Sequence, residues 1–288
     1  MRETWIAAMC LVVLASYPCA AESERGGNHP QKLEIPFELY NGHLLVVKGM
    51  VGHLKNVRIL LDTGKSPSAI SKELAEQLGL KGKTESLVFS NGELPVETVI
   101  LRQLNVGAWH VTSVRVLVQD LGYLRRSVGD SVGAIAGLDV LSTENFLIDY
   151  WRKKIVFGPV KILRNSVRFS QQKPFLTIKA QIEGQQLRLL VDSGTYGLLI
   201  YRERLKTYPA GFSTGQDASL STAAGSMRTA WFHASQVSLG ETNLGPKDIL
   251  IADVIPDARY EFDGLLGFAQ LGFQKVWFNF QDGTLAWE

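Results

Sequence analysis

The chain has 288 residues, of which 45% are hydrophobic and 20% are charged. This is the composition of a globular protein with enough apolar residues for one large core or two smaller ones. Thirty basic residues against twenty-eight acidic ones leave a formal net charge of +2. A balance this close to neutral gives no reason to expect a nucleic-acid or anionic-membrane partner.

The first 21 residues have the pattern of a secretory signal. Arg2 supplies a positive charge, residues 5–16 form an apolar run too short to span a bilayer comfortably, and small residues follow. We therefore expect residues 1–21 to be removed by a cut near Ala20 and Ala21. The mature protein would then be exported, to the periplasm or the medium. An uncleaved membrane anchor is the alternative interpretation.

Both cysteines of the chain, Cys10 and Cys19, lie inside this predicted signal. The mature protein would therefore have no disulfide, no cysteine nucleophile and no cysteine metal ligand. Residues 22–32, which follow, are polar and contain a Gly-Gly pair and a proline. This composition is typical of a flexible lead-in rather than of a folded element.

From Leu33 onward the sequence consists mainly of short apolar or alternating runs interrupted by Gly, Asn and Asp. Runs of this length, rich in Val, Ile and Leu, predict the strands of an all-β, mainly antiparallel protein. Helical patterns are sparse. One short helix is predicted over residues 71–80, with Ser71 as its N-cap, and a second over residues 200–208.

The two halves of the chain repeat one pattern. Residues 50–64 align without gaps on residues 180–194, which pairs Asp62 with Asp192. Later positions keep the same order at an offset of 130 to 133 residues: Gly92 with Gly225, Gly107 with Gly240, Asp120 with Asp253, and Gly137 with Gly267. A nearly constant offset, with length changes confined to predicted loops, indicates a duplicated unit of about 130 residues.

The duplication predicts two similar β-rich lobes, over residues 33–160 and 161–288, joined by a linker near residues 158–169. Two related lobes define a pseudo-two-fold axis, on which equivalent positions meet. Asp62 and Asp192, at the ends of equivalent runs, can therefore meet on this axis, and we expect their surroundings to be nearly equivalent.

An Asp-Thr-Gly triplet at 62–64 and an Asp-Ser-Gly triplet at 192–194 each follow an apolar run. One such triplet predicts only a tight turn, because Asp and Gly are common turn residues. A carboxylate at the end of a buried strand, however, is costly unless it is paired or hydrogen-bonded. Each half also carries an apolar-apolar-Gly segment, at 135–137 and 265–267, that would pack beneath the Asp turn.

The two triplets and the two apolar-apolar-Gly segments, in this order, resemble the aspartic proteases of the retropepsin-like and pepsin-like group. The resemblance extends from about Glu34 to Glu288, in a bacterial-type exported form with both lobes in one chain. It implies the acid-protease fold, with two β-barrel-like lobes, a few short helices and a cleft between the lobes. It also implies hydrolysis of peptide bonds by a water activated between Asp62 and Asp192, without a metal or another cofactor.

The resemblance implies supporting roles for further residues. The hydroxyls of Thr63 and Ser193 would cross-link the two loops, and the amides of Gly64 and Gly194 would point at the carboxyls. Four residues would lie at hairpin tips in the positions of the family's flaps: Asn91, Gly92, Ala224 and Gly225. An extended peptide or protein substrate would bind beneath these flaps like an added strand, to a monomer. Simple turns and ordinary surface hairpins are the alternative interpretation.

Lys65 departs from the family pattern, because Ala or Ser usually follows the first triplet. A cation beside the pair would favour ionisation of Asp62. We expect the long side chain to carry the ammonium away to solvent. The departure leaves a second hypothesis open, an inactive protein that binds an extended peptide in the same cleft. An aspartate buried against a permanent cationic partner would argue against hydrolysis.

Other chemistries have no support in the sequence. The histidines show neither metal-ligand spacing nor a recognisable serine-hydrolase arrangement: His29, His43, His53, His110 and His233. There is also no glycine-rich phosphate loop and no dinucleotide fingerprint.

Overall fold

The structure, a computed structural model, describes residues 6–7, 13–14, 32–89, 92–158, 160–172, 175–206, 217–222, 225–253 and 261–288. Most of the predicted signal and the lead-in therefore lie outside the described residues. No helix within the described ranges is long and apolar enough to cross a membrane.

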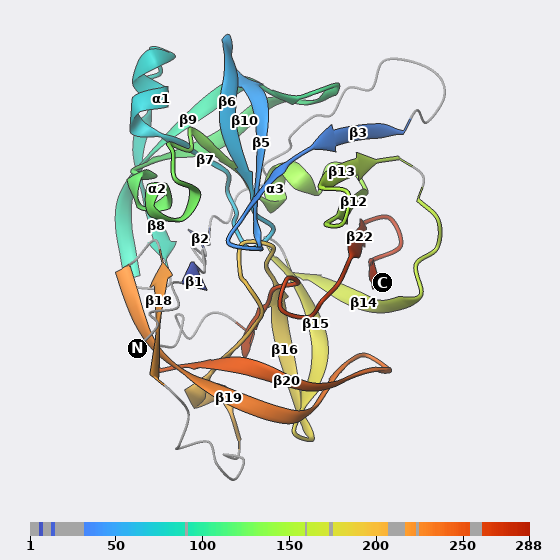
Figure 1. Cartoon of the computed structure of the whole chain (residues 1–288). Helices are drawn as coiled ribbons and strands as arrows, with labels where there is room; N and C mark the ends of the chain where they lie inside the picture. Colours follow the sequence, from blue (N-terminus) through green and yellow to red (C-terminus); the bar gives the residue numbers. More distant parts are fainter. Residues whose placement is uncertain are drawn as a thin grey trace.

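The first lobe is a sheet of nine described strands in the order β2-β8-β9-β10-β7-β11-β6-β5-β4 (Figure 1). A further pairing between β9 and β5 closes the middle of this sheet on itself, which gives a barrel-like lobe. The strands are β2 Val13–Leu14, β4 Glu38–Tyr40, β5 Leu44–Val51, β6 Leu54–Leu61, β7 Ala69–Ser71, β8 Lys83–Phe89, β9 Gly92–Val106, β10 Trp109–Gln119 and β11 Ala134–Ala136.

The second lobe repeats this arrangement strand for strand. The order β18-β19-β20-β17-β21-β16-β15 matches the order β8-β9-β10-β7-β11-β6-β5, and a pairing between β19 and β15 matches that between β9 and β5. The all-β, two-lobed fold predicted from the repeat is confirmed. The strands are β1 Ile6–Ala7, β15 Phe175–Ile182, β16 Gln185–Val191, β17 Leu198–Tyr201, β18 Asp217–Thr222, β19 Gly225–Leu239, β20 Thr242–Ala252 and β21 Gly264–Leu266.

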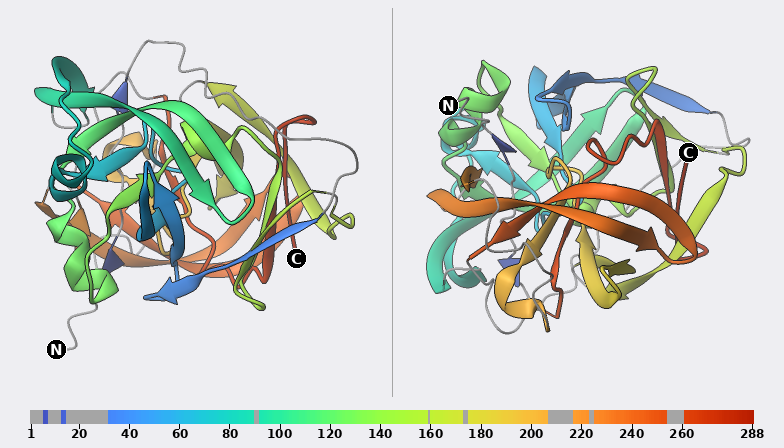
Figure 2. Two further views of the ribbon diagram at one scale, coloured as in Figure 1. Left: turned by 90° about the horizontal axis from the view of Figure 1, so that it is seen from above. Right: turned by 60° about the horizontal axis from the view of Figure 1, so that its bottom comes forward.

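A sheet built from both halves joins the lobes. Its order is β14-β23-β22-β12-β13-β3, so three strands come from each half of the chain. Figures 1 and 2 show this shared sheet on one side of the molecule and the hairpins β8–β9 and β18–β19 on the other. The strands are β3 Leu33–Pro36, β12 Phe146–Asp149, β13 Lys154–Phe157, β14 Asn165–Gln172, β22 Lys275–Asn279 and β23 Thr284–Trp287.

The predicted linker is too long. Strand β14 begins at Asn165 and pairs with β15 and β23, so the segment that connects β13 to β14 ends before the predicted limit at residue 169. The predicted division at residue 160 falls between these two strands.

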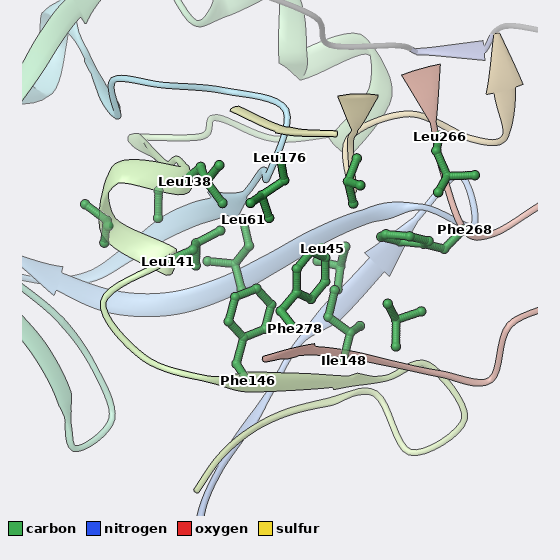
Figure 3. Packing of buried hydrophobic residues seen from close by; sticks show 14 of the residues in the cluster. Leu45, Leu61, Leu138, Leu141, Phe146, Ile148, Leu176, Leu266, Phe268 and Phe278 are labelled. Atoms are coloured by element: carbon green, nitrogen blue, oxygen red, sulfur yellow. The ribbon is translucent and has the colours of Figure 1, made fainter. Parts of the chain in front are cut away.

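The main hydrophobic core also crosses from one lobe to the other (Figure 3). The rings of Phe146 and Phe278 stack with their centroids 4.6 Å apart. Leu61, at the end of β6, and Val191, at the end of β16, belong to the same cluster of buried side chains. The strand ends that carry the two Asp loops therefore rest on one continuous apolar support.

The helices are short, as expected for this fold. Helix α1 (Lys72–Gln77) confirms the first prediction, because the Ser71 side chain accepts a hydrogen bond from the Leu74 amide and caps it. The second prediction is wrong over its described part, residues 200–206, since Ile200 lies in strand β17 and the 3₁₀ turn η2 (Arg202–Arg204) follows. Pairing with β20 and β21 fixes this segment as a strand. The remaining short elements are η1 Gly122–Leu124, α2 Arg125–Val128 and α3 Leu138–Leu141.

Candidate active site

Equivalent strands place the two aspartates. Asp62 directly follows β6 and Asp192 directly follows β16. The parallel neighbours β11 and β21 then fix each turn from beneath, as the apolar-apolar-Gly segments predict. The Asp62 amide donates to the carbonyl of Ala136 at 3.0 Å, and the Asp192 amide donates to the carbonyl of Leu266 at 2.9 Å.

The two loops are cross-linked by four reciprocal hydrogen bonds. Thr63 Oγ1 donates to the carbonyl of Val191 at 3.0 Å and accepts from the Ser193 amide at 2.9 Å. Ser193 Oγ donates to the carbonyl of Leu61 at 3.3 Å and accepts from the Thr63 amide at 3.0 Å. Both side chains are buried, so solvent offers these groups no alternative partners. The cross-link fixes one loop relative to the other.

The glycines of the triplets leave room for the carboxyls. A Cβ atom on Gly64 would lie 2.3 Å from Cγ of Asp192, and one on Gly194 would lie 3.1 Å from Cγ of Asp62. Each carboxyl therefore lies over the opposite loop. The Gly64 amide donates to Asp62 Oδ1 at 2.9 Å and the Gly194 amide to Asp192 Oδ1 at 2.7 Å. Side chains larger than hydrogen would push the carboxyls apart.

The surroundings of the two aspartates are not equivalent, contrary to the expectation from the repeat. Asp192 Oδ2 accepts a hydrogen bond from Thr195 Oγ1 at 2.8 Å. Asp62 Oδ2 is buried and has no hydrogen-bond donor within the described part of the chain. The difference arises because the position of Thr195 is taken by Lys65 in the first lobe.

Both carboxyls are fully buried, and their pKa values respond differently. Burial, followed by the charge of Asp192, raises the pKa of Asp62 well above its usual value. Burial raises the pKa of Asp192 to about 6, against the hydrogen bonds from Thr195 and Gly194, which lower it. The interaction between the two carboxyls raises the pKa of Asp62 and lowers that of Asp192. This arrangement favours a proton on Asp62 and a negative charge on Asp192.

The expectation that Lys65 reaches solvent is wrong. The side chain is fully buried, and its Nζ donates a hydrogen bond to Oε1 of Gln119, the last residue of β10, at 3.1 Å. The positive charge lowers the pKa of Asp62, but burial and the charge of Asp192 raise it more. Asp62 therefore retains a raised pKa in the presence of the nearby cation.

The flap candidates are only partly described. Gly92 begins β9 opposite Phe89, and Gly225 begins β19 opposite Thr222. Asn91 and Ala224 lie outside the described residues. The outer strands of both hairpins pair with segments from the start of the chain, β8 with β2 and β18 with β1.

Sequence reasoning did not identify Asp139, which belongs to the support of the first loop. Its carboxylate accepts the Ser68 amide at 3.0 and 3.1 Å and the Ser68 hydroxyl at 2.8 Å. The same hydroxyl accepts the Gly137 amide at 2.8 Å. The sequence does contain a difference that could have identified Asp139. It follows the first apolar-apolar-Gly segment, and no acidic residue stands at the equivalent place after the second.

Comparisons with known proteins identify the family of the chain. No curated protein matches the sequence. Among solved structures, a retropepsin-like aspartic protease from Rickettsia conorii is similar at 20% identity and a TM-score of 0.32, over 49% of this chain and 96% of that chain. The profile of the family described as aspartyl protease matches twice, over residues 47–139 and 178–269, and each match contains one Asp triplet. The chain belongs to the aspartyl protease family.

Proposed function

We propose that the protein is an endopeptidase of the aspartic type, in which Asp62 and Asp192, called the dyad below, activate a water molecule. One observation carries this proposal: the Thr63–Ser193 cross-link brings together two fully buried carboxyls that have unequal hydrogen bonds. Two adjacent carboxyls in such a site ionise as a coupled pair and hold one proton between them. The aspartic-protease dyad is the general precedent for this behaviour.

In the proposed reaction, ionised Asp192 removes a proton from the water while the water oxygen attacks the carbonyl carbon of the peptide. Protonated Asp62 gives its proton to the carbonyl oxygen, so a neutral tetrahedral diol forms. Asp192 then transfers its proton to the leaving nitrogen and the C–N bond breaks. A hydroxyl of the diol returns a proton to Asp62 as the new carboxyl group forms. Each aspartate ends in its starting state.

The proposed substrate is a peptide in extended conformation, bound between the lobes beneath the hairpins β8–β9 and β18–β19. Two observations support an extended ligand. The hairpins occupy equivalent places on the two lobes, on the side away from the shared sheet (Figure 2). Their outer strands, β8 and β18, can also accept an added strand, since each pairs with a short segment from the start of the chain.

The test is digestion of a peptide library by the wild-type protein and by the variants Asp62→Asn and Asp192→Asn. Each substitution abolishes the shared proton, so we expect each to lower the rate of cleavage by at least about 10²–10⁴-fold. The control is Asp282→Asn, the same change at an exposed turn of the second lobe, which should leave cleavage unchanged. Turnover by either dyad variant at the wild-type rate would refute the mechanism.

A binding protein without turnover is the second candidate, and the burial of Lys65 near Asp62 favours it. Such a protein would cleave no library peptide at any pH from 3 to 8. It would still bind extended peptides, and Asp62→Asn would leave their affinity unchanged. A hydroxyl-containing transition-state mimic separates the two functions, because an endopeptidase should bind it much more tightly than the corresponding substrate peptide.

We infer, further, that the protein is exported as a monomer, because residues 1–21 have a signal pattern and one chain supplies both lobes. Expression of the full chain with measurement of the mass and N-terminal sequence of the mature form tests this inference. Cleavage near Ala20 and Ala21 and the mass of one chain in solution are expected. A full-length product retained in the membrane would contradict it.

A further inference from the structure

Four polar side chains lie together behind the first Asp loop. They come from the loop itself, from the end of β10 and from the start of α3: Lys65, Ser68, Gln119 and Asp139. Lys65 and Ser68 are fully buried, whereas Gln119 and Asp139 are partly buried. Charged groups lose hydration free energy when they are buried, so their presence here requires compensating interactions.

Hydrogen bonds connect these side chains to the loop. Lys65 Nζ donates to Gln119, and the Asp139 carboxylate accepts both the amide and the hydroxyl of Ser68. The Leu138 amide donates to the Lys65 carbonyl at 2.7 Å, which fixes the backbone at the base of the lysine side chain. The network therefore ties β10 and α3 to the loop that begins at Asp62.

The second lobe has no charged residue at the four equivalent positions. At offsets of 130 and 133 residues, the equivalent positions hold Thr195, Leu198, Ala252 and Ala269. The backbone function of Ser68 is retained differently there, because the Gly267 amide donates to the carbonyl of Gly197 at 2.8 Å. The simultaneous loss of the cation and the anion from one lobe indicates that the two charges act together in the other.

Lys65 and Asp139 carry charges of opposite sign, and opposite charges near a carboxyl pair shift its ionisation in opposite directions. Burial raises the pKa of both Asp62 and Asp139, and the nearby positive charge of Lys65 lowers each of them to a smaller extent. A negative charge on Asp139 opposes a further negative charge on the dyad. Among the described residues, other titratable groups near Asp62 include Asp192, on the opposite loop, and Tyr123, in η1, on which the charge of Asp120, after β10, also acts. Burial raises the pKa of Tyr123, so it is neutral at physiological pH.

We propose that Lys65 is a positioning residue of the dyad and that the opposed charges of Lys65 and Asp139 set the pH range of catalysis. The proposal rests on the proposed peptidase function. Lys65 stabilises the anionic dyad and Asp139 destabilises it, so together they hold the active, singly protonated form near its working pH. The equivalent positions of the second lobe carry no charge and cannot supply this balance, so we place the control of dyad ionisation in the first lobe.

The test measures kcat/KM against pH for three variants. Lys65→Met removes the cation while keeping the length of the side chain, and should move both limbs of the profile up by about one pH unit. Asp139→Asn keeps the hydrogen-bond acceptor for Ser68 and should move the profile down. The double variant should return close to the wild-type profile. The control is Lys179→Met, the same charge change at an exposed position of β15, which should move nothing.

A lysine with only a packing role would lower activity at every pH without moving the profile, and that result would overturn the proposal. Shifts of the two single variants in the same direction would also overturn it. If Lys65→Met does not fold, the downward shift of Asp139→Asn and retention of the profile by Lys65→Arg decide the question. Carbon-13 NMR of labelled aspartates measures the dyad pKa without turnover. Opposite shifts without cleavage would therefore contradict the peptidase function and leave the electrostatic proposal standing.

Discussion

Asp62 and Asp192 follow equivalent strands but accept different hydrogen bonds. Thr195 donates to Oδ2 of Asp192, whereas the residue at that place in the first lobe, Lys65, donates from its ammonium group to Gln119. The sequence alone located the two aspartates, because the triplets recur at a fixed offset after apolar strands. It did not locate the Lys65 ammonium, since the direction of a long side chain depends on the cavity that distant elements leave for it.

At this scale, Thr195→Val should shift the acid limb of the pH profile. The substitution removes the 2.8 Å hydrogen bond that lowers the pKa of Asp192, so that pKa should rise further above about 6. A carboxyl with a higher pKa becomes ionised only at higher pH, so activity at pH 4–5 should fall more than activity at pH 7. We expect a shift of up to about one pH unit in kcat/KM.

The matched control for this prediction is Thr177→Val in β15. Thr177 is buried, and its hydroxyl has no hydrogen-bond partner within the described residues. Thr177→Val should therefore leave the acid limb of the pH profile unchanged. An unchanged acid limb in Thr195→Val itself would show that the Thr195 hydroxyl does not stabilise the Asp192 anion.

The repeated supersecondary unit was the most predictable part of the fold. Short apolar runs predicted strands, and the repeat predicted that both lobes have one pairing order. Ser71 likewise marked the start of α1 through a local hydrogen bond. A helix was predicted over residues 200–208, but the segment begins within strand β17. Pairing with β20 and β21 stabilises this strand, and a local sequence pattern does not reveal such pairing. The pairing of β12 with β22 was not predictable for the same reason.

The cross-link between the Asp loops should contribute measurably to stability. Thr63→Val removes a donor and an acceptor, which leaves the Val191 carbonyl and the Ser193 amide buried without partners. At about 1–3 kcal/mol for each unsatisfied group, we expect a loss of about 2–4 kcal/mol in the free energy of unfolding. Urea unfolding of the variant measures this loss.

Thr229→Val is the control for the cross-link. Thr229 is also buried, but its hydroxyl has no hydrogen-bond partner among the described residues, so the same substitution should cost little or nothing. Because the bonds of Thr63 and Ser193 are reciprocal, Thr63→Val and Ser193→Ala should not be additive in the double variant. Additive effects would indicate that the two hydroxyls act independently.

At the scale of the whole molecule, the two lobes share a sheet and a core. Phe146 lies in a strand of the first half and stacks on Phe278 from the second half (Figure 3). We expect Phe146→Ala to lower the free energy of unfolding by about 3–5 kcal/mol, because it leaves a cavity in the core common to both lobes. Thermal unfolding monitored by calorimetry and by tryptophan fluorescence measures the effect.

Trp151→Ala provides the comparison, since it deletes a larger ring that is 78% exposed and should change stability little. If the lobes depend on one another through this core, both probes should report one coincident transition for the Phe146→Ala protein. Two separate transitions in the wild-type protein would mean that each lobe is stable alone.

The shared sheet also determines when the protein can complete its structure during synthesis. Strand β12 can pair with β22 only after residues 275–279 have been synthesised. The Thr63 amide, in the loop of Asp62, likewise finds its acceptor only when Ser193 is present. A nascent chain that has emerged only as far as its first lobe therefore lacks both Asp192 and the strands that the second half contributes to the shared sheet. On the proposed mechanism such a molecule would lack one of the two aspartates that activate the water, so we expect cleavage to depend on the presence of both lobes.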